Sequence, residues 1–117
     1  MTDKRLEKLV LLLAEKTDAG ELPWEESEVS NAFHVSFTHG TARIEVRDSR
    51  QFAGDQEFIL KIINSSGAEV ERISDESSDV EGAYALMKKT YEGARRKAMQ
   101  VDIAIDSMID DLESGIF

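Results

Sequence analysis

The last third of the chain carries an apolar repeat that constrains the fold more than any other feature. Between Tyr84 and Leu112, apolar residues recur at alternating spacings of three and four. This seven-residue period predicts a long helix that packs against another helix. The seam consists of Tyr84, Met87, Tyr91, Ala94, Ala98, Val101, Ile105, Met108 and Leu112. The pattern indicates architecture and association, and it carries no chemistry of its own.

The length of the chain limits what can cover that helix. The sequence of 117 residues predicts one domain, residues 1–117. An unbroken helix to Glu113 would span about 52 Å, whereas a six-residue strand covers only about 20 Å. The second half of the helix would then overhang the sheet. Alternatively, the helix bends at Gly93 or breaks at Val101-Asp102, with Asp102 as a new cap.

The N-terminal segment predicts a further helix, from about Asp3 to Asp18. Thr2 or Asp3 would cap it, and Gly20 would end it. Leu11 and Leu12 widen its apolar face, so we expect the sheet and another helix to cover this helix on two sides. The apolar face itself comprises Leu6, Leu9, Val10 and Leu13.

The middle of the chain predicts antiparallel strands. Apolar and polar residues alternate over Phe33–Phe37 and Ala42–Val46, which is typical of strands with one buried face. Phe58, Leu60 and Ile62 form a third inward set, and Ile59 and Ile63 make this strand apolar on both faces. A short fourth strand is expected through Val70 and Ile73. Because the strands are joined by short polar turns, they predict a meander.

These elements together predict an α+β fold. We expect a four-stranded antiparallel meander, with the N-terminal helix and a long C-terminal helix, continuous or broken, on one face. Ser78 to Glu81 matches a capping box, so the long helix should begin there. The predicted core is Leu6, Leu9, Val10, Leu13, Trp24, Phe33, Val35, Phe37, Ile44, Val46, Phe58, Leu60, Ile62, Tyr84, Met87 and Tyr91.

The charge and composition disfavour several partners. The formal net charge is −10, and the 24 acidic residues outnumber the 14 basic ones, which argues against nucleic acid and anionic membranes as ligands. The chain has no cysteine for disulfide or thiolate chemistry. The apolar run Leu9–Ala14 is too short for a membrane span, and no cleavage site follows it. We expect an unprocessed cytoplasmic protein of bacterial type.

Two stretches resemble a group of small uncharacterised bacterial proteins. The first stretch is Leu13-Ala14-Glu15-Lys16-Thr17, followed by Gly20, Leu22, Trp24 and Glu25. The second stretch comprises Tyr91, Ala94-Arg95-Arg96, Val101-Asp102, Ile105 and Leu112. The resemblance implies the same layout of a helix, three or four antiparallel strands and a C-terminal helical region. It implies no activity, cofactor or catalytic residue.

The residues that could carry chemistry do not form a recognisable site. His34 and Ser36 share an outward strand face, but no nucleophile elbow or glycine-rich anion loop accompanies them. A calcium loop that begins at Asp75 would need glycine and glutamate where Val80 and Leu86 stand. The two histidines lack a metal-ligand spacing. We therefore expect a protein that is not an enzyme and has no catalytic, cofactor-binding or metal-binding residues.

The charges of the predicted long helix separate into two blocks. The basic block is Lys88, Lys89, Arg95, Arg96 and Lys97, and the acidic block is Asp102, Asp106, Asp110, Asp111 and Glu113. An antiparallel second copy crossing near Met99 would place each block beside the opposite one. Alternatively, both blocks are solvated faces of a monomer whose seam packs on its own first helix.

We therefore predict a non-enzymatic interaction module that forms a homodimer or docks on a protein partner. The predicted contact surface is Ala94, Ala98, Val101, Ile105, Met108, Ile109 and Leu112. One alternative is an acidic decoy or inhibitor that occupies the nucleic-acid site of a basic protein. The other is a small-ligand binding protein that uses the outer sheet face around His34, Arg43, Arg47 and Ile59.

Overall fold

The structure, a computed structural model, describes residues 4–117. The predicted caps Thr2 and Asp3 lie outside the described residues. Within this range the elements are α1 (Lys4–Asp18), β1 (Glu25–Glu26), β2 (Ala32–Phe37), β3 (Gly40–Asp48), β4 (Gln56–Asn64), β5 (Glu69–Ser74), α2 (Ala83–Ala98) and α3 (Val101–Ser114). The predicted α+β class with an antiparallel sheet is confirmed.

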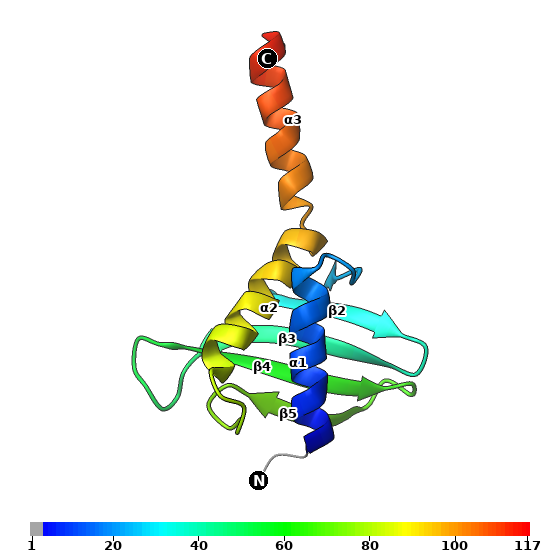
Figure 1. Cartoon of the computed structure of the whole chain (residues 1–117), viewed down its shortest axis with the longest axis vertical. Coiled ribbons are helices and arrows are strands. Elements are labelled where there is room, and N and C mark those ends of the chain that lie inside the picture. The colour runs from blue at the N-terminus through cyan, green and yellow to red at the C-terminus, as the bar shows by residue number, and fades with distance from the viewer. Residues whose placement is uncertain (1–3) are drawn as a thin grey trace.

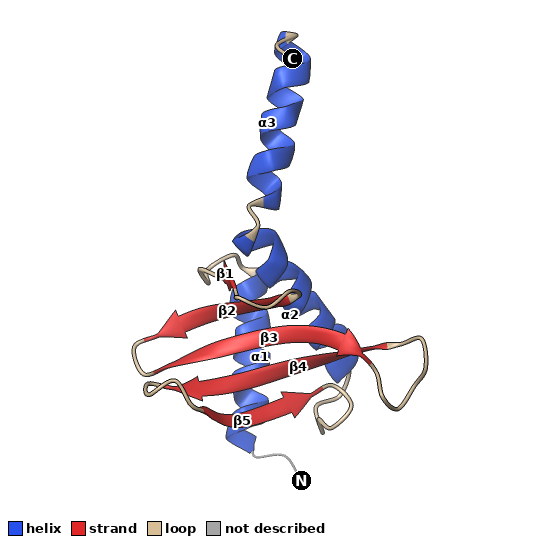
Figure 2. Ribbon diagram, turned by 180° about the vertical axis from the view of Figure 1, so that it is seen from behind, coloured by secondary structure: helices blue, strands red, loops and turns tan. Residues whose placement is uncertain are grey.

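The five strands form a meander in the order β1-β2-β3-β4-β5, and every neighbouring pair is antiparallel. The register aligns Phe33 with Ile44, Ile44 with Leu60, and Leu60 with Ile73. This places an apolar row on one face of the sheet. Helices α1 and α2 lie across that face, whereas the opposite face is open (Figures 1 and 2).

The core lies between the sheet and the two helices. Tyr91 of α2 packs against two strand aromatics, with ring centroids 5.4 Å from Phe33 and 5.5 Å from Phe58. Both separations are in the range that is favourable for tilted aromatic pairs. The buried apolar cluster is Val10, Leu13, Trp24, Phe33, Val35, Ala42, Ile44, Phe58, Leu60, Ile73, Met87, Tyr91 and Ala94. Leu6, Leu9, Val46 and Ile62 pack at its margin.

Two residues of the predicted core are exposed instead. Phe37 ends β2 beside the Gly40 turn, where neither helix covers it. Tyr84 is in the first turn of α2, and although its ring lies 5.6 Å from Phe58, one side faces solvent. Leu11 and Leu12 are also exposed because only one side of α1 faces the sheet and α2.

The predicted number of strands was wrong by one. The additional strand β1 has two exposed residues that pair with His34 and Phe33 of β2. A strand this short has no detectable alternation, so its sequence gives no signal. The predicted capping box is also absent: the Ser78 hydroxyl accepts a hydrogen bond from the Val80 N–H (3.0 Å), and α2 begins only after Gly82.

The predicted long helix is two helices. Helix α2 ends at Ala98, and Gln100 adopts a left-handed conformation (φ 53°) before α3 begins at Val101. Asp102 lies in the first turn of α3 rather than at its cap, and it pairs with Arg96 across the break. As a result α3 projects away from the sheet and from α1 (Figure 1).

Candidate interaction surface on the C-terminal helix

Helix α3 makes almost no contact with the rest of the described chain, residues 4–100, which we call the body. None of its residues, Val101–Ser114, is buried, and only Val101 at its base is partly covered. At 100° per residue, Val101, Ile105, Met108, Ile109 and Leu112 lie on one side of the helix. Leu112 is 69% exposed, so the side that a partner would normally cover faces solvent. We call these five residues the α3 stripe.

The physical chemistry of α3 makes this exposure unfavourable. A helix of 14 residues is marginal on its own in water, because packing of an apolar face supplies most helical stability. Its last turns carry Asp110, Asp111 and Glu113 and no basic residue, so these charges oppose the helix dipole. Association that covers the α3 stripe would supply the missing stability.

The seven predicted contact residues divide between the body and α3. Ala94 has no exposed surface, because it lies on the side of α2 that packs in the core. Ala98 is partly buried at the margin of the same cluster. The other five form the α3 stripe, so the break at Gln100 separates them from the core part of the seam.

Sequence reasoning missed two exposed apolar residues beyond α3. Ile116 is 72% exposed and Phe117 is 93% exposed. The spacing of four between Leu112 and Ile116 matches the apolar repeat, so a signal was present in the sequence, although α3 ends at Ser114 and Ile116 lies beyond it. The prediction did not use it, because it ended the helix at Glu113.

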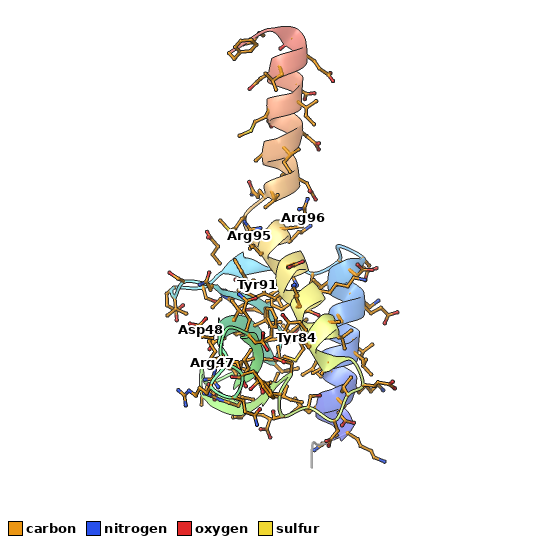
Figure 3. The ribbon with its side chains drawn as sticks, turned by 90° about the vertical axis from the view of Figure 1, so that its left-hand side faces the viewer. Arg47, Asp48, Tyr84, Tyr91, Arg95 and Arg96 are labelled. Atoms are coloured by element: carbon orange, nitrogen blue, oxygen red, sulfur yellow. The ribbon has the colours of Figure 1, made fainter. Side chains whose placement is uncertain are left out.

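The end of α2 is positively charged and lies next to the base of α3. Its last turn carries Arg95, Arg96 and Lys97 (Figure 3). Arg96 pairs with Asp102, whereas Arg95 makes no ion pair with any of residues 4–117. The charge blocks predicted from the sequence therefore lie on different helices, with the acidic one on α3.

A groove adjoins this basic end of α2. One pocket of about 390 Å³ is lined by residues that include Val46, Phe58, Tyr91 and Arg95. A second pocket of about 290 Å³ shares Tyr91 and Arg95 with the first and extends to Met99. We call the two together the Tyr91 groove. Its accessible apolar side chains are Val29 and Met99, and its charged side chains are Arg95, Arg96, Glu26 and Glu92. It can therefore accept an apolar segment with charged neighbours.

The Tyr91 phenol is the groove side chain whose ionisation is most affected by its surroundings. Burial raises the pKa of the Tyr91 phenol, and the nearby Arg95 charge only partly opposes this effect. The phenol therefore stays protonated at neutral pH and can act only as a hydrogen-bonding group.

The outer sheet face is occupied by ion pairs between its own side chains. Arg43 and Lys61 both contact Glu45, at 3.1 Å and 2.8 Å, and Ile59 is buried beneath the charged layer. Burial acts to raise the pKa of Glu57, but hydrogen bonds from Arg47 and Ser74 outweigh it, so the pKa is lowered. Glu57 therefore remains ionised and holds Arg47 at 2.7 Å.

The residues considered for hydrolysis are held by other partners. His34 Nδ1 lies 2.9 Å from the Ser27 hydroxyl, and the Ser36 hydroxyl lies 3.2 Å from that of Thr41. Within residues 4–117, no group of three or more acidic or histidine side chains is arranged to hold a metal ion. In the same range, no helix is both long and apolar enough to cross a membrane.

No protein family, curated protein or solved structure matches this chain.

Proposed function

We propose that this protein is a non-enzymatic interaction module that forms a homodimer through the α3 stripe. The observation that supports the proposal is an amphipathic helix of 14 residues that stands clear of its own body with no buried residue. Burial of apolar surface contributes about 25 cal/mol per Å², so pairing two such stripes stabilises both helices. A two-fold pairing needs only one surface, because each copy presents the same stripe.

The two alternative functions have less support. The hypothesis of an acidic decoy requires a continuous acidic surface. The basic residues Arg95, Arg96 and Lys97 interrupt that surface next to α3. The hypothesis of a small-ligand binding protein requires accessible side chains on the outer sheet face. There Arg43 and Arg47 are paired with carboxylates, and Ile59 is covered.

A matched pair of substitutions tests the proposed function. Ile105→Lys places a charge in the middle of the α3 stripe, and we expect it to convert the dimer to a monomer, as should Met108→Lys. Ile103→Lys is the control, because Ile103 is 62% exposed but lies about 200° around the helix from Ile105. Size-exclusion chromatography with light scattering at micromolar concentration measures the mass. Equal masses for the Ile105→Lys and Ile103→Lys proteins would exclude the stripe as the interface.

A further inference from the structure

We infer that the two copies pair with their α3 helices antiparallel, so that residues 110–117 of each copy contact the basic end of α2 and the Tyr91 groove of the other. The inference rests on the proposed function, because it assigns an orientation and a second contact to the same dimer. It identifies the occupant of the Tyr91 groove as the end of a second copy of this chain.

Charge favours the antiparallel orientation. A parallel pair would bring two copies of Asp110, Asp111 and Glu113 together at one end, with no basic residue in either α3. Like charges held side by side repel, so this arrangement is disfavoured. An antiparallel pair instead places each acidic end beside the last turn of the other copy's α2, which is basic.

The spacing of the α3 stripe also fits an antiparallel pair. When Ile105 of one copy faces Met108 of the other, Val101 faces Leu112 by the same register. Asp102 then flanks Ile109 of the second copy, so this acid faces an apolar side chain rather than another acid. On the other side of the pair, Asp111 likewise flanks Ala104.

The same register determines how far each helix reaches. Glu113 lies opposite Gln100 of the second copy, and Lys97 is three residues from Gln100. Although the chain turns at Gln100, Lys97 and Asp102 line the same pocket, so Lys97 lies near the base of α3. Residues 115–117 extend past the base of the other α3, where Met99 lines one end of the Tyr91 groove.

The end of the chain and the groove are chemically complementary. Phe117 and Ile116 are exposed apolar side chains that follow Glu113, while the groove offers the half-exposed Val29 and Met99 beside Arg95. A chain cannot fill its own groove in this conformation, because α3 carries these residues away from the body (Figure 1). A second copy running in the opposite direction brings them to it.

Cross-linking tests the orientation directly, since the chain contains no cysteine of its own. Ala104→Cys and Asp111→Cys lie at the rim of the stripe and face each other only between antiparallel copies. One protein carries an affinity tag so that mixed dimers are distinguished by mass. We expect a disulfide between the two variants when mixed, and little with either one alone. Efficient cross-linking of each variant with itself and not with the other would overturn the inference.

Charge reversal tests the contact with the end of α2. Lys97→Glu should raise the dimer dissociation constant about tenfold at low salt, less at high salt, and adding Glu113→Lys should restore association. Lys8→Glu, an exposed lysine on α1, is the control for the change in net charge. If Ile105→Lys abolishes the dimer but Lys97→Glu acts no differently from Lys8→Glu, the α2 contact is wrong and the proposed function stands. A monomeric unmodified protein would overturn both.

Discussion

At the scale of single residues, α1 and α2 approach each other closely at Gly93. Gly93 lies against Thr17, and a Cβ added at position 93 would be 2.7 Å from Thr17 Cγ2. Thr17 cannot rotate freely, because its hydroxyl accepts a 3.0 Å hydrogen bond from the buried Trp24 indole N–H. The glycine is therefore needed for close approach, and the bend considered for this position from the sequence is not observed within α2.

We expect Gly93→Ala to destabilise the protein by about 1–2 kcal/mol. Overpacking of this kind costs about 1–3 kcal/mol, and the higher helix propensity of alanine offsets up to about 1 kcal/mol. Urea denaturation followed by the fluorescence of Trp24, the only tryptophan, measures the change. Adding Thr17→Ser removes the clashing methyl but keeps the hydroxyl, so it should recover most of the loss. Equal stability of the wild type and the Gly93→Ala protein would contradict the steric argument.

A second residue-scale feature links β4 to the end of β5. Asp75 Oδ1 accepts a 2.7 Å hydrogen bond from the Phe58 N–H, and the Asp75 N–H donates to the Phe58 carbonyl. Burial raises the pKa of Asp75 and outweighs the hydrogen bond from Phe58, while nearby Glu76 and Glu57 act in the same direction as burial. This contact joins residues that are 17 positions apart in the sequence, so local sequence patterns do not reveal it.

The raised pKa predicts how Asp75→Asn depends on pH. A carboxyl with a raised pKa in the folded state contributes stability below its unfolded value of about 3.9, and this contribution is lost as the pH rises through the folded pKa. Asparagine keeps an acceptor for Phe58 without ionising. The stability of Asp75→Asn relative to wild type should therefore increase as the pH rises from the acid range to neutrality.

Urea denaturation at a series of pH values measures the difference, and Asp48→Asn serves as the comparison for losing one exposed carboxylate. A relative stability of Asp75→Asn that falls toward neutral pH would contradict the assigned direction of the pKa shift.

At the scale of elements, the periodicity of apolar residues predicted the helices and strands that bury one face. The period of two located β2, β3 and β4, and the apolar spacing of α1 located its buried residues Val10 and Leu13. The two-residue strand β1 could not be found this way, because its existence depends on pairing with β2. Phe37 and Tyr84 fit the pattern but lie where the neighbouring element ends, so their exposure is set by the lengths of the elements.

The break between α2 and α3 shows why the candidate surface was predicted only in part. Residues 98–102 contain no glycine or proline, so the sequence offered a break at Val101-Asp102 only as an alternative to a continuous helix. The observed break, at Gln100, is next to that position. The repeat continues across Gln100, although the core beneath it ends near Ala94 and Ala98. The point at which the core ends depends on the dimensions of the whole sheet. These dimensions cannot be deduced from the spacing of apolar residues in one segment. The acidic composition of α3, in contrast, was visible from the sequence.

At the scale of the whole molecule, the body and α3 differ in how their apolar side chains are covered. The body has a closed core that includes Trp24, whereas the α3 stripe is complete only when another surface covers it. The extents of 57 × 37 × 25 Å reflect this division, since α3 lies along the longest axis (Figure 1). Association through α3 would therefore leave the sheet and its core unchanged.

This division predicts how the stability of the body depends on concentration. If the end of a second copy contacts the groove beside Tyr91, association stabilises the folded body. Each tenfold rise in concentration above the dissociation constant then adds up to about 1.4 kcal/mol per dimer, or about 0.7 kcal/mol per chain. The urea midpoint reported by Trp24 fluorescence should therefore rise with protein concentration. A chain that ends at Gln100 should keep the core but show a midpoint independent of concentration, equal to that of the full chain at high dilution. A full-chain midpoint that does not change with concentration, in a protein shown to be a dimer, would mean that α3 associates without contacting the body of the second copy.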